Sequence, residues 1–375
     1  MLEKLNLNNI NKSNWVSFRF EDIAKRVTEA VNPNTTSLEK YVGLEHIDAE
    51  NIHIKRYGTP DDVSGGKLKC YPGDVIFGKR RAYQRKAAIV DFEGICSAHA
   101  FVFRANQEVI NPKLFPFFLH SDQFMHRAVD ISVGGLSPTI NWGDLKHQEF
   151  LIPPNEEQVN LLELLCAMDD VIEKEKSVFN QLDLLFKSKI KFISDDTIHF
   201  LESKKIKDVC NIKDNLRKPL NSSERDSIKG DIPYYGANGL VDRINDFIFN
   251  EDLVLVAEDG GNFNEFFTKE IAYPVKGKSW VNNHAHVLTV KNKSISIEWL
   301  YFSLVHKNLL KYIIGTTRLK LNKSELELVK IWVPPTEKMN EMVVELDKIL
   351  EARKISQSKI AATQSLQKSI INQIF

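Results

Sequence analysis

The feature that most constrains this chain is that its second half repeats its first. The sequence FLIPP at residues 150–154 is matched, 181 residues later, by IWVPP at residues 331–335. Upstream, the same order is kept by four further matches: Asn141 with Asn322, Gly134 with Gly315, residues 97–100 with residues 282–285, and residues 73–76 with residues 251–254. Chance similarity of short apolar strands is the alternative, but the conserved order favours a duplication with divergent loops. We therefore expect two domains of similar fold.

A long segment without glycine or proline follows each Pro-Pro pair, at residues 155–193 and 336–375. In the first segment, ten positions from Leu161 to Ile193 alternate by four and three residues, and eight of them are apolar. This spacing is typical of a coiled-coil seam. The second segment has a weaker seam, which is interrupted by Arg353, Ser356, Thr363 and Gln367. Each helix would be about 58 Å long, so we expect the two to pair as an antiparallel coiled coil.

The segments between these helices combine short apolar strands with Gly, Asn and Asp turns, which indicates mixed α/β domains. We therefore predict the fold class α/β (α+β), with two similar globular domains that are each followed by a long helix. Short helices are expected over residues 112–129, starting after Asn111, and over residues 297–313, starting near Ser296. The predicted organisation is a globular domain at 1–154, a helix at 155–193, a linker at 194–203, a globular domain at 204–335 and a helix at 336–375.

The charge balance, the cysteine spacing and the length of the apolar runs exclude several classes of protein. Lys and Arg together number 50, and so do Asp and Glu, so the formal net charge is zero. This balance argues against a protein that coats nucleic acid through bulk positive charge, although local basic patches remain possible. The four cysteines are far apart, which argues against a disulfide scaffold or a zinc ribbon. No apolar run is long enough for a membrane span. We expect a cytoplasmic protein with no membrane partner.

No catalytic or metal-binding pattern is evident. Residues 277–279 read GKS, as at the end of a phosphate-binding loop, but Ala272 stands where that loop needs a glycine. His284 and His286 share one strand face without an evident third ligand, so structural roles are favoured over metal binding. Glu258 and Asp259 lie in a Gly-Gly turn, where we expect them to be solvated. We predict no catalytic residue, no metal and no cofactor on this chain.

Binding chemistry is concentrated in loops that occupy matching places in the two repeats. A basic loop at residues 79–86 carries five cations, together with a tyrosine and a glutamine, and these side chains suit DNA bases and phosphates. The matching loop at residues 258–264 is acidic and rich in amides, which suits cytosine amines and adenine rather than phosphates. The candidate DNA-binding residues of these loops are Lys79, Arg80, Arg81, Tyr83, Gln84, Arg85 and Lys86 in the first, and Asp259, Asn262 and Asn264 in the second.

A second pair of matching segments, residues 134–139 and 315–320, combines glycines with small hydroxyl residues. Such segments can contact phosphates and so position a protein on DNA without reading sequence. An ordinary turn before the last strand of each domain is the alternative. The candidates here are Ser137 and Thr139 in the first repeat, and Thr316, Thr317, Arg318 and Lys320 in the second.

The duplicated plan, the Pro-Pro exits and the long helices together resemble the specificity subunit of type I restriction-modification systems. The turn IPYYGANG at residues 232–239 looks like the Pro-x-Tyr-Gly-x-x-Gly element of the family's target recognition domains, which adds Tyr235 and Asn238 to the DNA-binding candidates. The resemblance covers essentially the whole chain. The first domain has YVGLEHI at residues 41–47 instead of this turn, so the equivalence of the two opening regions is left open.

The resemblance implies a non-catalytic subunit whose two domains each read one half of a bipartite, asymmetric DNA site, with the helix pair fixing their separation. It also implies partners: double-stranded DNA, two methyltransferase subunits and a restriction-translocase subunit, which would carry AdoMet, ATP and Mg. Two alternatives remain. One is a recognition subunit of another DNA-modification or phage-defence system. The other is a duplicated-domain coiled-coil scaffold that binds proteins or glycans.

Overall fold

A computed structural model of the chain describes residues 10–198, 202–291, 293–315 and 319–375. The chain divides into two compact units, Met1–Glu175 with Ser358–Phe375, and Lys176–Gln357. The division falls within both long helices, so each unit contains a stretch of each helix. Within the described residues, no helix combines the length and the apolar character that crossing a membrane would require.

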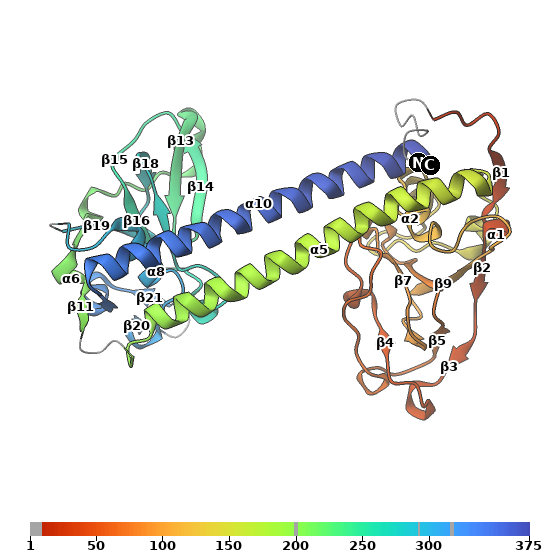
Figure 1. The fold of residues 1–375 in the computed structure, drawn as a ribbon, viewed down its shortest axis with the longest axis horizontal. Coiled ribbons are helices and arrows are strands. Elements are labelled where there is room, and N and C mark those ends of the chain that lie inside the picture. The colour runs from red at the N-terminus through yellow and green to blue at the C-terminus, as the bar shows by residue number, and fades with distance from the viewer. Residues whose placement is uncertain (1–9, 199–201, 292, 316–318) are drawn as a thin grey trace. The chain divides into compact units, whose positions relative to one another are not determined.

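The first unit is built on two four-stranded sheets and a two-stranded ribbon (Figure 1). One sheet has the order β2 (Ala24–Val27), β9 (Ala100–Ala105), β6 (Val75–Gly78), β7 (Ala87–Ile89). The other has the order β3 (Ala30–Val31), β5 (Lys67–Cys70), β8 (Gly94–Cys96), β4 (Tyr41–Val42), and the ribbon pairs β1 (Val16–Arg19) with β10 (Glu149–Ile152). The short helices are α1 (Phe20–Ile23), α2 (Phe115–Leu119), α3 (Asp122–Asp130) and α4 (Trp142–Leu145).

The second unit repeats this plan. Its sheets have the orders β12 (Cys210–Ile212), β19 (Ala285–Val290), β16 (Leu253–Ala257), β17 (Ala272–Val275), and β14 (Gly239–Ile244), β13 (Lys229–Gly236), β18 (Lys278–Val281), β15 (Phe249–Asn250). Its two-stranded pairs are β11 (Ser203–Lys205) with β22 (Lys330–Trp332), and β20 (Ile313–Ile314) with β21 (Lys320–Leu321). The short helices are α6 (Ile206–Val209), α7 (Ser222–Ser227), α8 (Ile297–Leu304) and α9 (Lys323–Leu328).

The opening regions of the two domains are equivalent, which answers the question that the sequence left open. In the first unit, β4 runs parallel to β8, and Ser97 N–H donates to the Val42 carbonyl at 3.0 Å. In the second, β13 runs parallel to β18, and Asn282 N–H donates to the Tyr235 carbonyl at 3.0 Å. Residues 41–43 therefore stand where Tyr-Tyr-Gly stands at 234–236. The fourth strand differs, because β3 extends the sheet beside β5 whereas β14 extends it beside β13.

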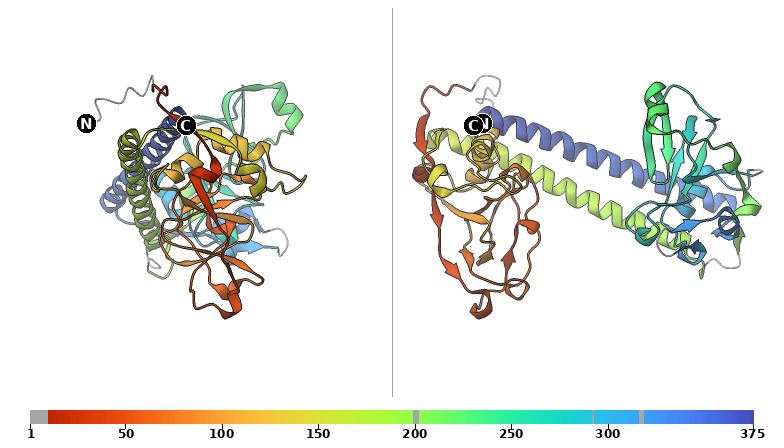
Figure 2. Two further views of the ribbon diagram at one scale, coloured as in Figure 1. Left: turned by 90° about the vertical axis from the view of Figure 1, so that its right-hand side faces the viewer. Right: turned by 180° about the vertical axis from the view of Figure 1, so that it is seen from behind.

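The two long helices are α5 (Asn155–Ser194) and α10 (Thr336–Ile374), and they pack together as an antiparallel pair, as the sequence predicted. Within each unit, a stretch of α5 lies beside a stretch of α10 in all three views (Figures 1 and 2). Each helix starts the same way, because the carbonyls of Pro154 and Pro335 accept hydrogen bonds from the backbone N–H groups of Gln158 and Met339. A proline just before a helix is favourable, since its missing N–H would have no helical partner.

Both helices contribute to the main core of each unit. In the first unit, Leu161 and Leu165 of α5 and Ile370 of α10 are buried against the aromatic side chains around Phe20. In the second, Phe186 of α5 and Leu346 of α10 are buried with the domain's own apolar residues. The helices therefore belong to the domains' cores as well as to each other.

Arg353, one of the residues that interrupt the seam of α10, is accommodated by aromatic packing. Its guanidinium lies 5.0 Å from the ring centroid of Phe186 and 5.7 Å from that of Phe179, and it pairs with Asp183 at 2.7 Å. Cation–π contacts of this kind let a charged side chain lie in an otherwise apolar seam.

Two predicted helices are shorter than expected. The helix expected over residues 112–129 is two helices, because Ser121 interrupts it and caps the second one by accepting from Phe124 N–H at 3.2 Å. The helix expected over residues 297–313 starts after Ser296, as predicted, but ends at Leu304. A separate 3₁₀ turn follows at Leu310–Tyr312.

Candidate nucleic-acid interface

In the first unit, the basic loop follows β6 and is held in a tight, unusual conformation. A 3₁₀ turn, Ala82–Gln84, is flanked by Arg81 and Arg85, whose φ angles are 57° and 52°. Left-handed backbone is uncommon at residues other than glycine, and such residues cluster at functional sites. The surrounding structure must therefore fix this loop.

The structure brings the two segments that the sequence singled out in this domain side by side. Arg80 forms a bridge with Thr139, and Arg81 N–H donates to the Pro138 carbonyl at 2.7 Å. The Arg81 guanidinium also donates to Ser137 Oγ at 3.0 Å. Residues 79–86 and 134–139 therefore form one surface, which we call the basic surface.

In the part of the chain that the structure describes, the cations at the start of the basic surface are not neutralised by acidic side chains. Among the described residues, Lys79, Arg80 and Arg81 form no ion pair with a carboxylate. The Lys79 ammonium lies 5.1 Å from the ring centroid of Phe101, and the guanidinium of Arg26, from β2, lies 5.9 Å from the same ring. Burial lowers the pKa of Lys79, and the positive charge of Arg26 lowers it further. This concentration of positive charge suits a polyanion.

Other side chains of the loop are engaged inside the unit. Arg85 pairs with Glu50 at 3.0 Å and with Asp122 at 2.8 Å, and it donates to the His120 carbonyl at 2.6 Å. Lys86 donates to the Leu44 carbonyl at 2.5 Å. These two cations hold the loop in place. By contrast, Tyr83 is exposed, while Gln84 is half-buried.

In the second unit, the matching loop follows β16, and three predicted segments meet there. Asn238 donates from its amide to the Gly260 carbonyl at 3.0 Å, and Asp259 forms a bridge with Lys320. Asn262 and Asn264 lie at the 3₁₀ turn Phe263–Glu265 of the same loop. We call this set the amide surface.

The other candidates of the second unit flank the amide surface or lie outside the described residues. The ring of Tyr235 lies 5.9 Å from that of Tyr273, whose hydroxyl donates to the Gly236 carbonyl. Burial raises the pKa of Tyr235. Thr316, Thr317 and Arg318 lie outside the described residues.

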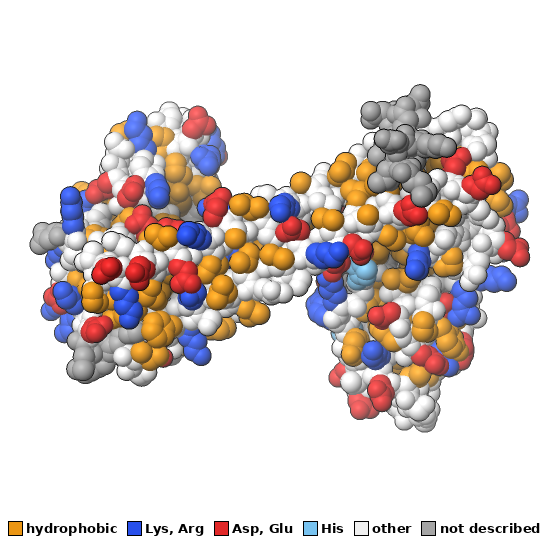
Figure 3. All heavy atoms as spheres, viewed as in Figure 1, with side chains coloured by type: hydrophobic (Ala, Val, Ile, Leu, Met, Phe, Trp, Pro, Cys, Tyr) orange, Lys and Arg blue, Asp and Glu red, His pale blue; other side chains and the backbone are white. Residues whose placement is uncertain are grey.

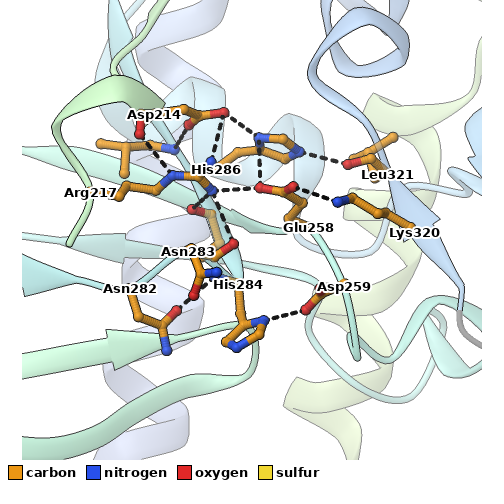
Figure 4. A network of polar contacts seen from close by, with 12 residues as sticks. Asp214, Arg217, Glu258, Asp259, Asn282, Asn283, His284, His286, Lys320 and Leu321 are labelled. Atoms are coloured by element: carbon orange, nitrogen blue, oxygen red, sulfur yellow. Dashed lines mark hydrogen bonds and ion pairs between the residues drawn. The ribbon is translucent and has the colours of Figure 1, made fainter. Parts of the chain in front are cut away.

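A largely buried polar network adjoins the amide surface and includes its Lys320 (Figure 4). His286, which is 1% exposed, lies between Asp214 Oδ2, 2.6 Å from its Nδ1, and the Leu321 carbonyl, 2.8 Å from its Nε2. Glu258 pairs with Arg217 at 2.6 Å and with Lys320 at 3.2 Å. Burial would raise the pKa of Asp214, but the hydrogen bond from His286 and neighbouring positive charge hold it below its usual value.

This network bears on two expectations from the sequence: that Glu258 and Asp259 are solvated, and that His286 lacks further metal ligands near it. The expectation that Glu258 and Asp259 are solvated is wrong, because Glu258 is largely buried between two cations and Asp259 contacts the His284 ring. Carboxylate and imidazole atoms of Asp214, Glu258 and His286 lie within 4.8 Å of one another, as metal ligands would. Arg217 contacts both carboxylates, however, and supplies the positive charge that a metal would bring.

The two units therefore place opposite chemistry at the same position. Strand pairing aligns Phe77 with Phe101 in the first unit and Val256 with His286 in the second. Phe77 of β6 is therefore equivalent to Val256 of β16. Lys79 lies two residues after Phe77 and Glu258 lies two residues after Val256, so Lys79 and Glu258 occupy equivalent positions. Sequence reasoning missed Arg26, Asp214 and Arg217, since each is far along the chain from its loop and no local pattern marks it.

The comparisons with known proteins agree with this duplicated plan. The sequence pattern of the family described as "Type I restriction modification DNA specificity domain" matches residues 12–183 and again residues 201–364. The chain belongs to this family. The two matches cover both units and most of both long helices.

Named relatives of this specificity family match in part. A protein named as a type I restriction enzyme specificity subunit of Haemophilus influenzae is 38% identical over 147 residues, which is 39% of this chain. The specificity subunit of the type I restriction enzyme EcoDI of Escherichia coli is 29% identical over 168 residues, or 44% of this chain. In each case, the match spans 37% of the relative's own length.

Solved structures share the fold over nearly the whole chain. The S subunit of a type I restriction-modification system from M. genitalium has a TM-score of 0.62 and 16% identity, and the match covers 100% of this chain and 98% of that one. A chain from a study of complex assembly and conformational transition in the type I R-M system has a TM-score of 0.54 and 18% identity, with 96% and 97% covered. At these identities, the likeness concerns the fold.

Proposed function

We propose that this chain is the non-catalytic DNA-recognition subunit of a type I restriction-modification complex in the cytoplasm, and that each unit reads one half of a bipartite, asymmetric site. The observation that carries the proposal is the opposite chemistry at one position of a duplicated fold. Lys79 and Arg80 of the first unit, which pair with no carboxylate of the described residues, suit phosphates and guanine edges, whereas Asp259 and the amides of the second unit suit cytosine and adenine. Two identical half-sites would not call for such divergence.

We propose that the long helices fix the distance between the half-sites and dock two methyltransferase subunits. Apolar side chains are exposed along both long helices, which supports docking of a partner (Figure 3). These side chains are Val159, Val171, Val178, Leu184, Leu185 and Phe192 on α5, and Val344, Ile355 and Leu366 on α10. On the face drawn, acidic and basic side chains are interspersed, in keeping with the zero net charge. A restriction-translocase subunit would complete the complex. AdoMet, ATP and Mg would be bound by these partners.

Selection of bound DNA from a random library tests the proposal. The full chain, co-expressed with its methyltransferase subunits, should enrich two short, dissimilar sequences separated by a gap of fixed length. Substitutions in the basic surface should change one half-site, and substitutions in the amide surface should change the other. Enrichment of no sequence, together with binding to a protein or glycan, would favour the scaffold alternative.

An insertion in the helix pair tests the proposed ruler. Four residues added near positions 173–176 of α5 should lengthen the helix by ~6 Å and rotate its C-terminal part by only ~40°. Because a base pair occupies about 3.4 Å of duplex, the selected gap should grow by one or two base pairs while both half-site sequences stay the same. A four-residue insertion only locally unwinds a coiled coil. An unchanged gap in a complex that still assembles would show that the helices do not set the spacing.

A further inference from the structure

The most exposed large apolar side chain of the described residues belongs to the basic surface. Leu136 is 97% exposed, and the next in order, Leu184, is 68% exposed. Single exposed leucines on a protein surface are ordinary. The position of Leu136 is not, because it stands at the tip of the loop that contacts Arg80 and Arg81.

The loop that carries Leu136 is narrow and fixed at its base. Val133 and Thr139 exchange two backbone hydrogen bonds, at 3.1 Å and 2.9 Å, and Arg81 holds the Pro138 carbonyl and the Ser137 hydroxyl. Gly134 adopts a φ of 113°, which a residue with a side chain rarely does. The base of the loop is thus held by backbone contacts, while its tip extends into solvent.

The surroundings of the tip favour nucleic acid over an apolar protein partner. A Cβ added to Gly135 would meet no atom within 4 Å, so the tip has open space around it. Lys79, Arg80 and Arg81, which have no carboxylate partner among the described residues, lie at the base of the same loop. An apolar partner surface would leave these cations desolvated and unpaired, whereas phosphates would neutralise them.

We propose that Leu136 is a wedge that inserts between two stacked base pairs of the half-site read by the first unit. Apolar side chains inserted in this way unstack a base step and kink the duplex. Pyrimidine–purine steps unstack most easily, so the wedge would contribute specificity for such a step without a hydrogen bond to a base. This inference rests on the proposed DNA-reading function.

The wedge is expected in one half-site only. Thr317, which lies outside the described residues, stands at the matching sequence position of the second repeat, 181 residues after Leu136. A threonine is shorter and carries a hydroxyl, so it lacks the apolar volume that replaces a stacked neighbour. The half-site read by the second unit should therefore keep its base stacking.

Fluorescence of 2-aminopurine tests the wedge in the full chain co-expressed with methyltransferase subunits and bound to its selected site. The base analogue is placed at each purine position of both half-sites in turn. Binding should raise the fluorescence at one step of the first half-site. L136A and L136T should abolish this rise, while L136M, which keeps an apolar side chain of similar volume, should preserve it. The affinity of L136A should fall about tenfold.

The controls separate the wedge from other sources of signal. L240A, which removes an exposed leucine of β14 in the second unit, should change neither fluorescence nor affinity. A base flipped out by a methyltransferase subunit would give a signal that L136A leaves unchanged, and if only such signals appear, the wedge is wrong. Leu136 could instead add affinity by contacting a thymine methyl group, and replacing that thymine with uracil tests this. If the uracil substitution removes the effect of Leu136 on affinity and no 2-aminopurine signal reports unstacking, the wedge proposal is also wrong. If library selection yields no site, the proposed function itself fails.

Discussion

The two units carry side chains of opposite charge at an equivalent position of the same fold. At the position after β6, the first unit has Lys79 over the ring of Phe101, while the position after β16 in the second has Glu258 beside His286. In the first unit, Lys79, Arg80 and Arg81 have no carboxylate partner among the described residues, whereas Arg85 is paired. In the second, Glu258 is neutralised by Arg217 and Lys320.

The difference shows where each unit can gain binding energy. Cations without an acidic partner contribute most binding free energy when they contact DNA phosphates. This contribution falls as the salt concentration rises, because binding releases counterions. A surface whose charges are already paired gains little from phosphates and must rely on hydrogen bonds between its amides, or Asp259, and base edges. We therefore expect the first unit to supply most of the salt-dependent affinity of the chain itself.

The largest effect is expected from replacing His286 by phenylalanine, the residue that the first unit has at this place. The substitution removes the imidazole whose Nδ1 lies 2.6 Å from Asp214 and 3.8 Å from Glu258, and it leaves Asp214 with only the Val287 N–H and Arg217 as partners among the described residues. Breaking a buried ionic network in this way should lower the free energy of unfolding by about 3 kcal/mol. Urea denaturation, with hydrogen exchange to locate the change in the second unit, measures it.

His284 provides the matched control for this change. It lies two residues before His286, in the turn that precedes β19, and also contacts an aspartate, Asp259, but its side chain is 42% exposed. H284A should therefore cost far less stability than H286F. Equal losses from the two variants would mean that the buried network has no special role.

The next effect concerns DNA affinity in the first unit. If Arg80 contacts DNA, R80A should weaken binding by ~1–3 kcal/mol and relax the sequence preference of the first half-site only. K79A should reduce the dependence of affinity on salt, because one phosphate contact is lost. The comparison variant is D259A in the second unit, which should alter the second half-site with little change in salt dependence. Fluorescence anisotropy at several salt concentrations checks all three variants. Identical salt dependence in all of them would remove the distinction between the units.

A smaller effect is expected at Arg85, for which the structure favours a different role from the one the sequence predicted. Because Arg85 is held by Glu50, Asp122 and the His120 carbonyl, we expect it to position the basic loop rather than to read bases. R85A should lower the free energy of unfolding by about 1 kcal/mol, since both carboxylate partners are partly exposed. The base preference of the bound site should stay the same. A changed base preference with unchanged stability would restore the direct reading role.

The sequence predicted the architecture well because the repeat carries long-range information. Matching landmarks such as the two Pro-Pro pairs align segments about 180 residues apart, and the four-three spacing of apolar residues in α5 requires a partner helix. Local signals were less reliable. Nothing in the run of residues 112–129 indicates that Ser121 would cap a new helix rather than continue one.

The candidate site was predicted as loops but not as a set of interacting side chains. The positions of residues 79–86 and 134–139 were evident, yet their contact depends on strand pairing that sequence spacing does not reveal. The same holds for Asp214, which reaches His286 from 72 residues away. Whether a cation is free or paired is likewise set by residues brought together in the fold, as the contrast between Arg80 and Arg85 illustrates.

The smallest expected effect is a pH dependence of stability that differs between the two units, because each unit contacts α5 through different ionisable groups. In the first unit, His53 contacts Asp169 of α5 at 2.6 Å, and this hydrogen bond raises the pKa of His53, with Glu173 adding to the rise and Lys55 opposing it. In the second unit, Lys307 contacts Asp196 at 2.6 Å and the Ser194 carbonyl at 3.0 Å, at the end of α5. Burial lowers the pKa of Lys307, but the ordinary pKa values of lysine and aspartate lie far from neutrality. The first contact should therefore respond more strongly than the second between pH 6 and pH 8.

The sign of this response follows from the direction of the shift. A histidine whose pKa is raised in the folded state stabilises that state fully below its unfolded pKa of about 6.5, and the contribution is lost as the pH rises through the folded pKa. The stability of the first unit should thus fall between pH 6 and pH 8, by less than about 1 kcal/mol because His53 is 36% exposed. Hydrogen exchange at both pH values, read separately for residues 155–175 and 176–194 of α5, measures the change. H53Q should flatten the response of the first stretch alone. An unaltered response in H53Q would assign the pH dependence to another group and leave the two units alike in how they hold α5.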